Sequence, residues 1–277
     1  MLFQKTNSPN DTKKVFRKKG TCSHTMFYLL DREFGASHPA EERAADPLAG
    51  GISQHGYQCG MLWGAVMAAG AEAYRRAGSL EKAIPPAMSA GQRLLDSFKS
   101  RAKSHNCMEI TDINFRKRFG IFKYLITGGA FSCFNLAAKW KPEACAAAAE
   151  SLDESTDTAS GQALTCTSEL VRKMGGTDQQ AAMASALAGG MALSGNTCGA
   201  LGAAIWMKTL PASTANPEKS AFNESVAGGV IAKFMAHTGG ETHCEQLCGR
   251  RFGSLAGHAE YVRAGGCAEL INSLAGE

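Results

Sequence analysis

Ten cysteines are the residues of this sequence best suited to chemistry. A cysteine thiolate can act as a nucleophile, a metal ligand or a partner in thiol–disulfide exchange. The first residues, MLFQKTNSPNDTKK, contain no apolar export segment, so we expect a cytoplasmic protein. Thiols are kept reduced in the cytoplasm, which disfavours a disulfide framework. The cysteines therefore indicate metal binding or redox chemistry.

Eight of the ten cysteines recur in matching surroundings in the two halves of the chain. In LAGGISQHGYQCG and LAGGMALSGNTCG, the second glycine lies eight residues before Cys59 or Cys198. The interval to the next cysteine is 48 residues in the first half (59 to 107) and 46 in the second (198 to 244). The four pairs are Cys22 and Cys166, Cys59 and Cys198, Cys107 and Cys244, and Cys133 and Cys267, whereas Cys145 and Cys248 have no counterpart.

This duplication predicts the organisation of the chain. Residues 1–20 form a basic N-terminal leader, either a solvated terminus or a contact for anionic partners. Residues 21–150 form the first repeat and residues 161–277 the second. Between them, residues 151–160 have the polar, acidic composition of a linker. We expect the two repeats to pack as a pseudo-twofold pair.

The elements that must position the cysteines are predicted to be helices. Segments such as MLWGAVMAAGAEAYRRAG carry apolar residues at three- and four-residue spacing and end at glycine. No alternating, strand-like stretch stands out, so the predicted fold class is all-α. Cys59 and Cys198 begin such helices, where backbone N–H groups lower the pKa of a thiol. Cys133 and Cys267 follow glycine pairs, which let a backbone approach a bulky group or simply cap a helix.

Dispersed thiolates suit three kinds of chemistry. An iron–sulfur cluster is normally held by cysteines. A structural zinc site usually uses close C-x2-C pairs, and thiol–disulfide exchange often uses C-x-x-C, neither of which is present. Cys244 and Cys248 lie one helical turn apart and could bind one metal or form a disulfide, but Asp112 lies near the matching place in the first half. His105 and His243 lie near the third cysteine of each half, as candidate ligands or proton donors or as surface residues.

Other classes of function find little support. The formal net charge of +4 is too small to indicate a nucleic-acid partner. The best candidate for a membrane segment, FGIFKYLITGGAFSCFNLAAKW, is interrupted by Lys123, two glycines and Asn135, so we expect no integral membrane segment. The sequence has no phosphate-binding loop and no clear acid–base constellation. Whether the protein is an enzyme therefore stays open.

The motif CGMLWG, from Cys59 to Gly64, is followed by further single cysteines and resembles the C_GCAxxG_C_C family of redox-active proteins. The second copy reads CGALGA, with Gly202 one residue early and Ala203 at the place of the motif glycine. The resemblance covers nearly the whole chain as two tandem copies and implies a helical fold and a redox role. The module is also similar to that of the split-Soret cytochromes, which carry haem segments and a non-haem iron–sulfur centre.

This resemblance implies one or two iron–sulfur clusters per chain and electron transfer with a redox partner protein. The implied ligand sets are Cys22, Cys59, Cys107 and Cys133 for one cluster, and Cys166, Cys198, Cys244 and Cys267 for the other. The spacing of Cys248, one helical turn after Cys244, makes it a candidate for an extra ligand. A metal-free thiol–disulfide protein that uses Cys244 and Cys248 is an alternative. A helical binding or scaffold protein with zinc or inert cysteines is another, and a homo-oligomer is compatible with each.

Overall fold

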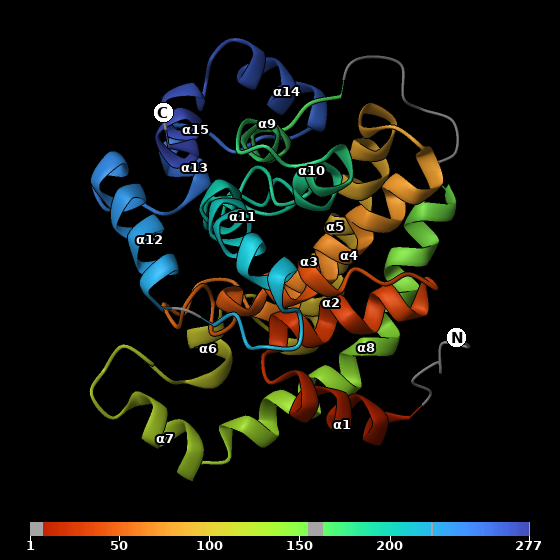
Figure 1. The fold of residues 1–277 in the computed structure, drawn as a ribbon, viewed down its shortest axis with the longest axis vertical. Coiled ribbons are helices and arrows are strands. Elements are labelled where there is room, and N and C mark those ends of the chain that lie inside the picture. The colour runs from red at the N-terminus through yellow and green to blue at the C-terminus, as the bar shows by residue number, and fades with distance from the viewer. Residues whose placement is uncertain (1–7, 155–162, 223, 277) are drawn as a thin grey trace.

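The fold is all-α, as the sequence predicts. The computed structural model describes residues 8–154, 163–222 and 224–276. Within these ranges the regular elements are helices, and the extended contacts are the isolated bridges Gln58–Asn106 and Thr197–His243. Figure 1 shows the helices wrapped around a central group made of α4, α5, α10 and α11.

The two halves contain corresponding helices in the same order. The first half comprises α1 (Pro9–Lys19), α2 (Cys22–Glu33), α3 (Pro39–Ala44), the 3-10 helix η1 (Asp46–Leu48), α4 (Gly60–Ala77), α5 (Leu80–Ala102), α6 (Cys107–Thr111), α7 (Gly120–Ile126) and α8 (Gly129–Glu154). The second comprises α9 (Cys166–Lys173), α10 (Asp178–Ser185), α11 (Gly199–Ala215), α12 (Glu224–Thr238), α13 (Cys244–Leu247), α14 (Leu255–Arg263) and α15 (Ala268–Ala275). By their cysteines, α2 matches α9, α4 matches α11, α6 matches α13 and α8 matches α15.

The repeats pack reciprocally. Helix α10 of the second repeat lies against α4 of the first, and α3 of the first lies against α11 of the second. Small side chains allow this close approach, since a Cβ on Gly70 would lie 2.4 Å from the backbone oxygen of Ala182. At the centre, a Cβ on Gly202 would lie 2.4 Å from the ring of Trp63. The indole ring therefore accounts for the glycine that falls one residue early in the second motif.

Hydrogen bonds also cross between the repeats. The indole N–H of Trp206 donates to the backbone oxygen of Glu41 at 3.0 Å. The side-chain amide of Gln58 donates to the backbone oxygen of Gly190 at 2.9 Å. Trp63 of the first repeat and Trp206 of the second belong to one continuous cluster of buried side chains. The repeats therefore share one core and form the pseudo-twofold pair that the duplication predicts.

A left-handed turn precedes the second cysteine of each repeat. Five consecutive residues have positive φ in the first repeat, with values of 67° at Gly50, 68° at Gly51, 59° at Ile52, 44° at Ser53 and 66° at Gln54. The matching residues 189–193 have φ values from 50° to 77°. Three residues of each turn carry side chains, which costs roughly 1–2 kcal/mol per residue in this conformation. The repetition of so strained a turn in both repeats points to a function for it.

The leader and the linker are partly helical. Helix α1 lies within the predicted leader and packs Phe16 on Phe134, with ring centroids 4.6 Å apart. Helix α8 extends to Glu154, into the predicted linker, and residues 155–160 lie outside the described residues.

No single helix in the described ranges is both long and apolar enough to cross a membrane. Helices α7 and α8 meet the requirement only when taken together, and the chain bends by 69° between them.

Candidate functional site: two cysteine-lined cavities

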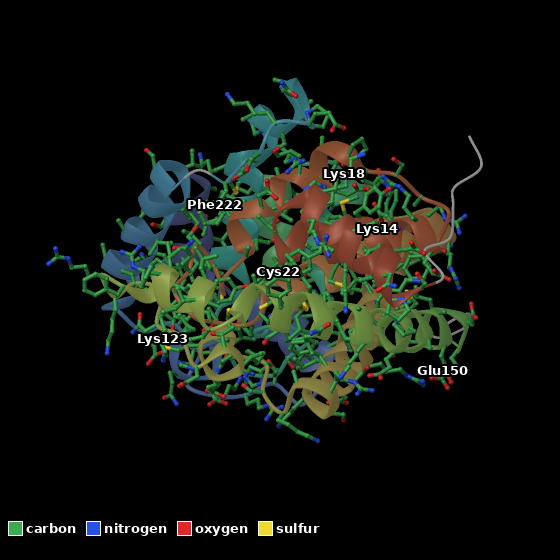
Figure 2. The ribbon with its side chains drawn as sticks, turned by 90° about the horizontal axis from the view of Figure 1, so that it is seen from below. Lys14, Lys18, Cys22, Lys123, Glu150 and Phe222 are labelled. Carbon is green, nitrogen blue, oxygen red and sulfur yellow. The ribbon has the colours of Figure 1, made fainter. Side chains whose placement is uncertain are left out.

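The paired cysteines gather at two cavities, one in each repeat. The first has a volume of about 270 Å³ and is lined by Cys22, Cys59, Cys107 and Cys133. The second has a volume of about 570 Å³ and is lined by Cys166, Cys198, Cys244, Cys248 and Cys267. The structure therefore brings together the members of each predicted set, and their role as ligands stays a prediction. Cys22 lies near the centre of the face shown in Figure 2.

Helix N-termini position seven of the eight paired cysteines. Cys22, Cys107, Cys166 and Cys244 are the first residues of their helices, and Cys59, Cys198 and Cys267 are N-caps. Cys133 differs because α8 begins four residues before it. Free backbone N–H groups at a helix start stabilise negative charge on a nearby sulfur.

A short antiparallel contact holds the second and third cysteines of each repeat together. The N–H of Cys59 donates to His105 O at 2.7 Å, and the N–H of Cys107 donates to Tyr57 O at 2.7 Å. In the second repeat, the N–H of Cys198 donates to Thr242 O at 2.8 Å, and the N–H of Cys244 to Asn196 O at 2.7 Å. The same pairing in both repeats explains why the spacing between these cysteines is so similar.

The left-handed turn brings a backbone N–H to the first cysteine of each repeat. The N–H of Gly50 lies in hydrogen-bond contact with the sulfur of Cys22, and that of Gly189 with the sulfur of Cys166. The glycine that follows in each turn has no room for a side chain. A Cβ on Gly51 would lie 2.4 Å from the backbone of Tyr57, and one on Gly190 would lie 2.4 Å from that of Asn196.

In the first cavity, negative charge is favoured on Cys22. Its pKa is lowered by the hydrogen bond from the Cys59 thiol and by the N–H groups of Gly50 and Ser23, which outweigh its burial. The pKa of Cys59 is raised by the same hydrogen bond and by burial. Burial raises the pKa of Cys133 to about 11, although the hydroxyl of Tyr124 donates a hydrogen bond to its sulfur. The pKa of Cys107 is also raised, first by burial.

In the second cavity, negative charge is favoured on two sulfurs. Hydrogen bonds from Cys267 and His258 hold the pKa of Cys166 well below its usual range. Hydrogen bonds from Cys244, Cys267 and Tyr261 lower the pKa of Cys248 to about 3. The pKa values of Cys244 and Cys267 are raised, because these thiols are the donors. Burial raises the pKa of Cys198 to about 12.

Two tyrosines at the cavities were missed by sequence reasoning, although the sequence carries a signal for them. Tyr124 and Tyr261 each lie four residues before a glycine pair, in YLITGG and YVRAGG. The second glycine makes room for the ring, since a Cβ on Gly129 or Gly266 would lie 2.3 Å from it. These glycine pairs therefore admit a tyrosine beside Cys133 and Cys267.

His258 was also missed, and no repeated pattern points to it. Its side chain is 1% exposed, and burial lowers its pKa, but contact with Cys166 outweighs this and raises it. The histidines that the sequence suggested lie elsewhere. The Nε2 atom of His105 lies 2.8 Å from the side-chain oxygen of Asn196, and His243 is half exposed beside Glu241. Neither imidazole lines a cavity.

Cys248 has no cysteine counterpart, and Asp112 lies one residue beyond the matching place in the first half. The Sγ atoms of Cys248 and Cys244 lie 3.9 Å apart. Four residues after Cys107, the residue that occupies this place is Thr111, which lines the first cavity. Asp112 follows α6 in a left-handed conformation and its side chain is fully exposed.

Cys145 lies apart from both cavities. It is buried in α8, and burial raises its pKa to about 12 despite the contact with Lys141. Desolvation at this site keeps it a neutral thiol, so it serves packing and provides a natural control for the cavity cysteines.

The cavity thiols do not converge on a single point. Among the described residues, no three His, Cys, Asp or Glu side chains lie close enough together to share one metal ion. The sulfurs instead surround a space, most of them at helix starts, with Cys133 inside α8 and Cys248 at the end of α13. Such a lining can surround a group larger than one ion or present thiols to a reactant.

The fold and the cavities define a class of duplicated helical proteins with one set of four cysteines per repeat. The family model described as "Putative redox-active protein (C_GCAxxG_C_C)" matches residues 21–152 and again residues 162–276. The chain therefore belongs to this family, in two tandem copies, and the family description supports a redox role. No curated protein and no solved structure shows a significant match to the chain.

Proposed function

We propose that this protein is a cytoplasmic electron-transfer protein that holds one iron–sulfur cluster in each cavity and exchanges electrons with a redox partner protein. The observation that carries the proposal is the repeated arrangement of four cysteines, drawn from four separate segments, around each cavity. Four cysteine sulfurs are the usual ligand set of such clusters. A cluster, when bound, supplies one-electron transfer at a potential that its surroundings set.

The residues around the first cavity fit such a group. Gly60 leaves the space beside Cys22 open, since a Cβ there would lie 2.5 Å from the Cys22 sulfur. The N–H groups of Gly50 and Ser23 stabilise thiolate charge on Cys22. Phe16, Phe115 and neighbouring apolar side chains line the rest of the cavity and keep it poor in water.

The two cavities differ in polarity, so we expect two different reduction potentials. A tyrosine donates to a sulfur in each cavity, but the second cavity adds His258 as a further donor and is lined by Glu241 and Gln246. Hydrogen bonds to cluster sulfurs stabilise the more negative, reduced form and raise the potential. The second centre should therefore have the higher potential of the two.

The test is anaerobic purification with analysis of iron and acid-labile sulfide. We expect a brown protein with both present in near-equal amounts. Cys59→Ser and Cys198→Ser should each lose about half of the iron, because each removes one of the four ligands at one cavity. Cys145→Ser is the matched control and should keep all of it, since Cys145 lies outside both cavities. A colourless wild-type protein with no iron and a full set of free thiols would overturn the proposal.

A second candidate function is thiol–disulfide exchange at Cys244 and Cys248. The distance of 3.9 Å between their sulfurs and the low pKa of Cys248 support it. The Cys248 thiolate would attack a disulfide of the partner, and Cys244 would then displace the partner's second thiol. One disulfide forms in this protein while one breaks in the partner, with transfer of two electrons and two protons.

Metal content and thiol titration separate the candidates. An iron-free protein whose thiols oxidise and recover reversibly, and in which Cys248→Ser abolishes this cycle, favours thiol–disulfide exchange. Zinc bound without any redox response favours a helical binding or scaffold protein.

A further inference from the structure

The exposed large hydrophobic side chains of the described residues all lie in one segment. They are Met108, Phe119, Ile121, Phe122, Leu125, Ile126 and Phe131. We call the last six, which lie on and beside α7, the α7 patch. Its members are between 49% and 67% exposed. Concentration of apolar surface in one place marks an interaction site.

Helix α7 is exposed on nearly all sides. Within it, only Gly120 is buried and only Tyr124 is half-buried. These two residues attach the helix to the body. A Cβ on Gly120 would lie 2.2 Å from the backbone oxygen of Asn114, and the ring of Tyr124 packs edge-on against Phe115 at 5.1 Å. On the opposite side, Ile121, Phe122, Leu125 and Ile126 recur at i, i+1, i+4 and i+5 and form one exposed apolar face.

Basic residues surround the α7 patch. Arg116, Lys117 and Arg118 directly precede it and are exposed, and Lys123 lies within it. The sequence from residue 113 to residue 142 contains no Asp or Glu. Nearby acidic groups are Asp112, whose carboxylate lies 3.7 Å from the Lys123 ammonium, and exposed Glu109.

Helix α1 extends this basic surface. In Figure 1, α1 and α7 both lie at the lower end of the molecule, and Figure 2 shows Lys14 and Lys18 on the same face as Lys123. Lys14 and Lys18 are exposed, although Lys14 lies 3.8 Å from the carboxylate of Asp11. An anionic surface would meet positive charge at Lys14, Lys18 and Lys123 on this face, while the acidic residue Glu150 lies near the end of α8.

The second repeat lacks an equivalent of the α7 patch. Between α13 and α15, its largest apolar side chain is Phe252, which is 6% exposed and lies under Arg250. Leu255 and Val262 are half-buried. The repeat fold therefore does not require exposed apolar residues at this place, and the α7 patch is a feature of the first repeat.

We propose that the α7 patch inserts into the surface of a membrane that contains anionic lipids. The apolar side chains of α7 share one broad face, which is the arrangement of a helix that lies in a membrane interface with its apolar side in the lipid. The flanking Arg and Lys residues match anionic headgroups, and their long side chains can reach the headgroup layer. Because α8 packs its later residues, such as Ala137 and Trp140, into the protein core, the segment would enter one leaflet and not cross it.

Docking of this kind would place the first cavity next to the membrane. Tyr124 of α7 lines that cavity, and its hydroxyl donates a hydrogen bond to Cys133. Binding of lipid does not depend on whether a cluster occupies the cavity, so this inference stands apart from the proposed function.

The experiment is co-sedimentation with vesicles. Wild-type protein should bind vesicles of phosphatidylcholine mixed with phosphatidylglycerol and bind pure phosphatidylcholine far more weakly, with binding reduced at high salt. The double variant Phe122→Ser with Leu125→Ser should lose at least about tenfold in affinity, because two exposed apolar anchors are removed. Both side chains are exposed, so the helical content by circular dichroism should be unchanged.

A charge variant and its matched control test the role of the basic residues that precede the α7 patch. The triple variant Arg116→Gln, Lys117→Gln, Arg118→Gln should bind about a hundredfold more weakly. The control changes the same net charge at exposed lysines on α5, α11 and α12, with Lys82→Gln, Lys208→Gln and Lys233→Gln, and should bind almost like wild type.

A fluorescent variant reports the insertion directly. All three native tryptophans are buried, so Phe122→Trp adds an exposed reporter whose emission should shift to the blue with anionic vesicles. The proposal is overturned if wild type fails to bind these vesicles, or if the apolar double variant binds equally well. It is also overturned if the patch instead mediates self-association, seen as a concentration-dependent dimer that the double variant abolishes without any vesicle binding.

Discussion

At the scale of single residues, hydrogen-bond donors decide where charge lies in each cavity. Burial alone raises the pKa of a thiol, as it does at Cys107 and Cys198. Cys22 is partly buried and Cys166 is buried, yet the pKa values of both are lowered because thiol and backbone N–H donors surround them. Cys22 in the first repeat, and Cys166 and Cys248 in the second, thus favour negative charge, which suits a metal ligand as well as a nucleophile.

A second group of buried charges lies away from the cavities, at the joint between α2 and α3. Asp31 is fully buried, and one of its carboxylate oxygens lies 2.8 Å from Nδ1 of His38. Burial raises the pKa of Asp31 to about 7, although contact with His38 opposes this. Burial lowers the pKa of His38, but the Asp31 carboxylate outweighs it and the net change is upward.

This pair predicts a pH dependence of stability. Between about pH 4 and pH 7, Asp31 is ionised in the unfolded chain but keeps its proton in the fold, so the free energy of unfolding falls as pH rises. The slope from this group is at most about 1.4 kcal/mol per pH unit. Asp31→Asn cannot ionise and should flatten the dependence.

Thermal unfolding of wild type and Asp31→Asn, followed by circular dichroism from pH 5 to pH 8, measures this difference. The difference in melting temperature between the two proteins should grow as pH rises, because the variant becomes more stable relative to wild type. Parallel curves would show that the buried pair does not titrate in this range.

At the scale of elements, the left-handed turn is the most strained part of the site. Gly51 and Gly190 have φ values of 68° and 77°, and a Cβ at either would meet backbone at 2.4 Å. Gly239 has a similar φ of 62°, but a Cβ there would meet nothing within 4 Å. A comparison of alanine substitutions at Gly51 and Gly239 therefore separates two effects. Both place a side chain on a left-handed residue, but only the substitution at Gly51 also brings a Cβ into contact with the backbone.

We expect Gly51→Ala to be clearly more destabilising than Gly239→Ala. Each substitution lowers the free energy of unfolding by roughly 1–2 kcal/mol, because a residue with a side chain takes a left-handed conformation. Gly51→Ala also forces the backbone at Tyr57 to move, at a further cost of about 1–3 kcal/mol. Urea unfolding measures the difference, and Gly190→Ala should repeat the result in the second repeat. Equal losses for Gly51→Ala and Gly239→Ala would mean that the turn has room to adjust.

The same turn shows what a sequence can and cannot predict here. Periodicity and terminal glycines predicted the helices, and matched local sequences predicted which cysteines gather together. The left-handed course of residues 52–54 and 191–193 was not predictable, because ISQ and MAL share no residue type that favours positive φ. His258 was not predictable either, since only the tertiary fold brings α14 to Cys166.

At the scale of the whole molecule, the two repeats depend on each other. Trp206 of α11 donates its hydrogen bond to Glu41 in α3, and Gln58 donates to the left-handed turn of the other repeat at Gly190. Trp63 is fully buried with its ring beside Gly202. Separation of the repeats would expose these aromatic rings to water and leave buried polar groups unpaired.

A cut between the repeats should therefore leave the molecule assembled. A protease site placed within residues 155–160, between α8 and α9, allows cleavage after folding. The two fragments should co-elute at the mass of the intact chain and keep the tryptophan emission of a buried environment, and they should separate only in denaturant. Fragments that separate in buffer while each keeps its helical circular dichroism would show that the repeats are independent domains.

A matched pair of variants ties this outcome to the interface. Gly70→Ala places a Cβ 2.4 Å from the backbone oxygen of Ala182, where α4 and α10 meet, so its cleaved fragments should separate at a lower denaturant concentration. Gly228→Ala on α12 meets nothing within 4 Å and should behave like the cleaved wild type. Gly70 lies in α4, whose N-cap is Cys59. A shift of α4 at this interface should therefore also move Cys59 in the first cavity. Such a result would show that contacts with one repeat help to maintain the shape of the cysteine-lined cavity in the other.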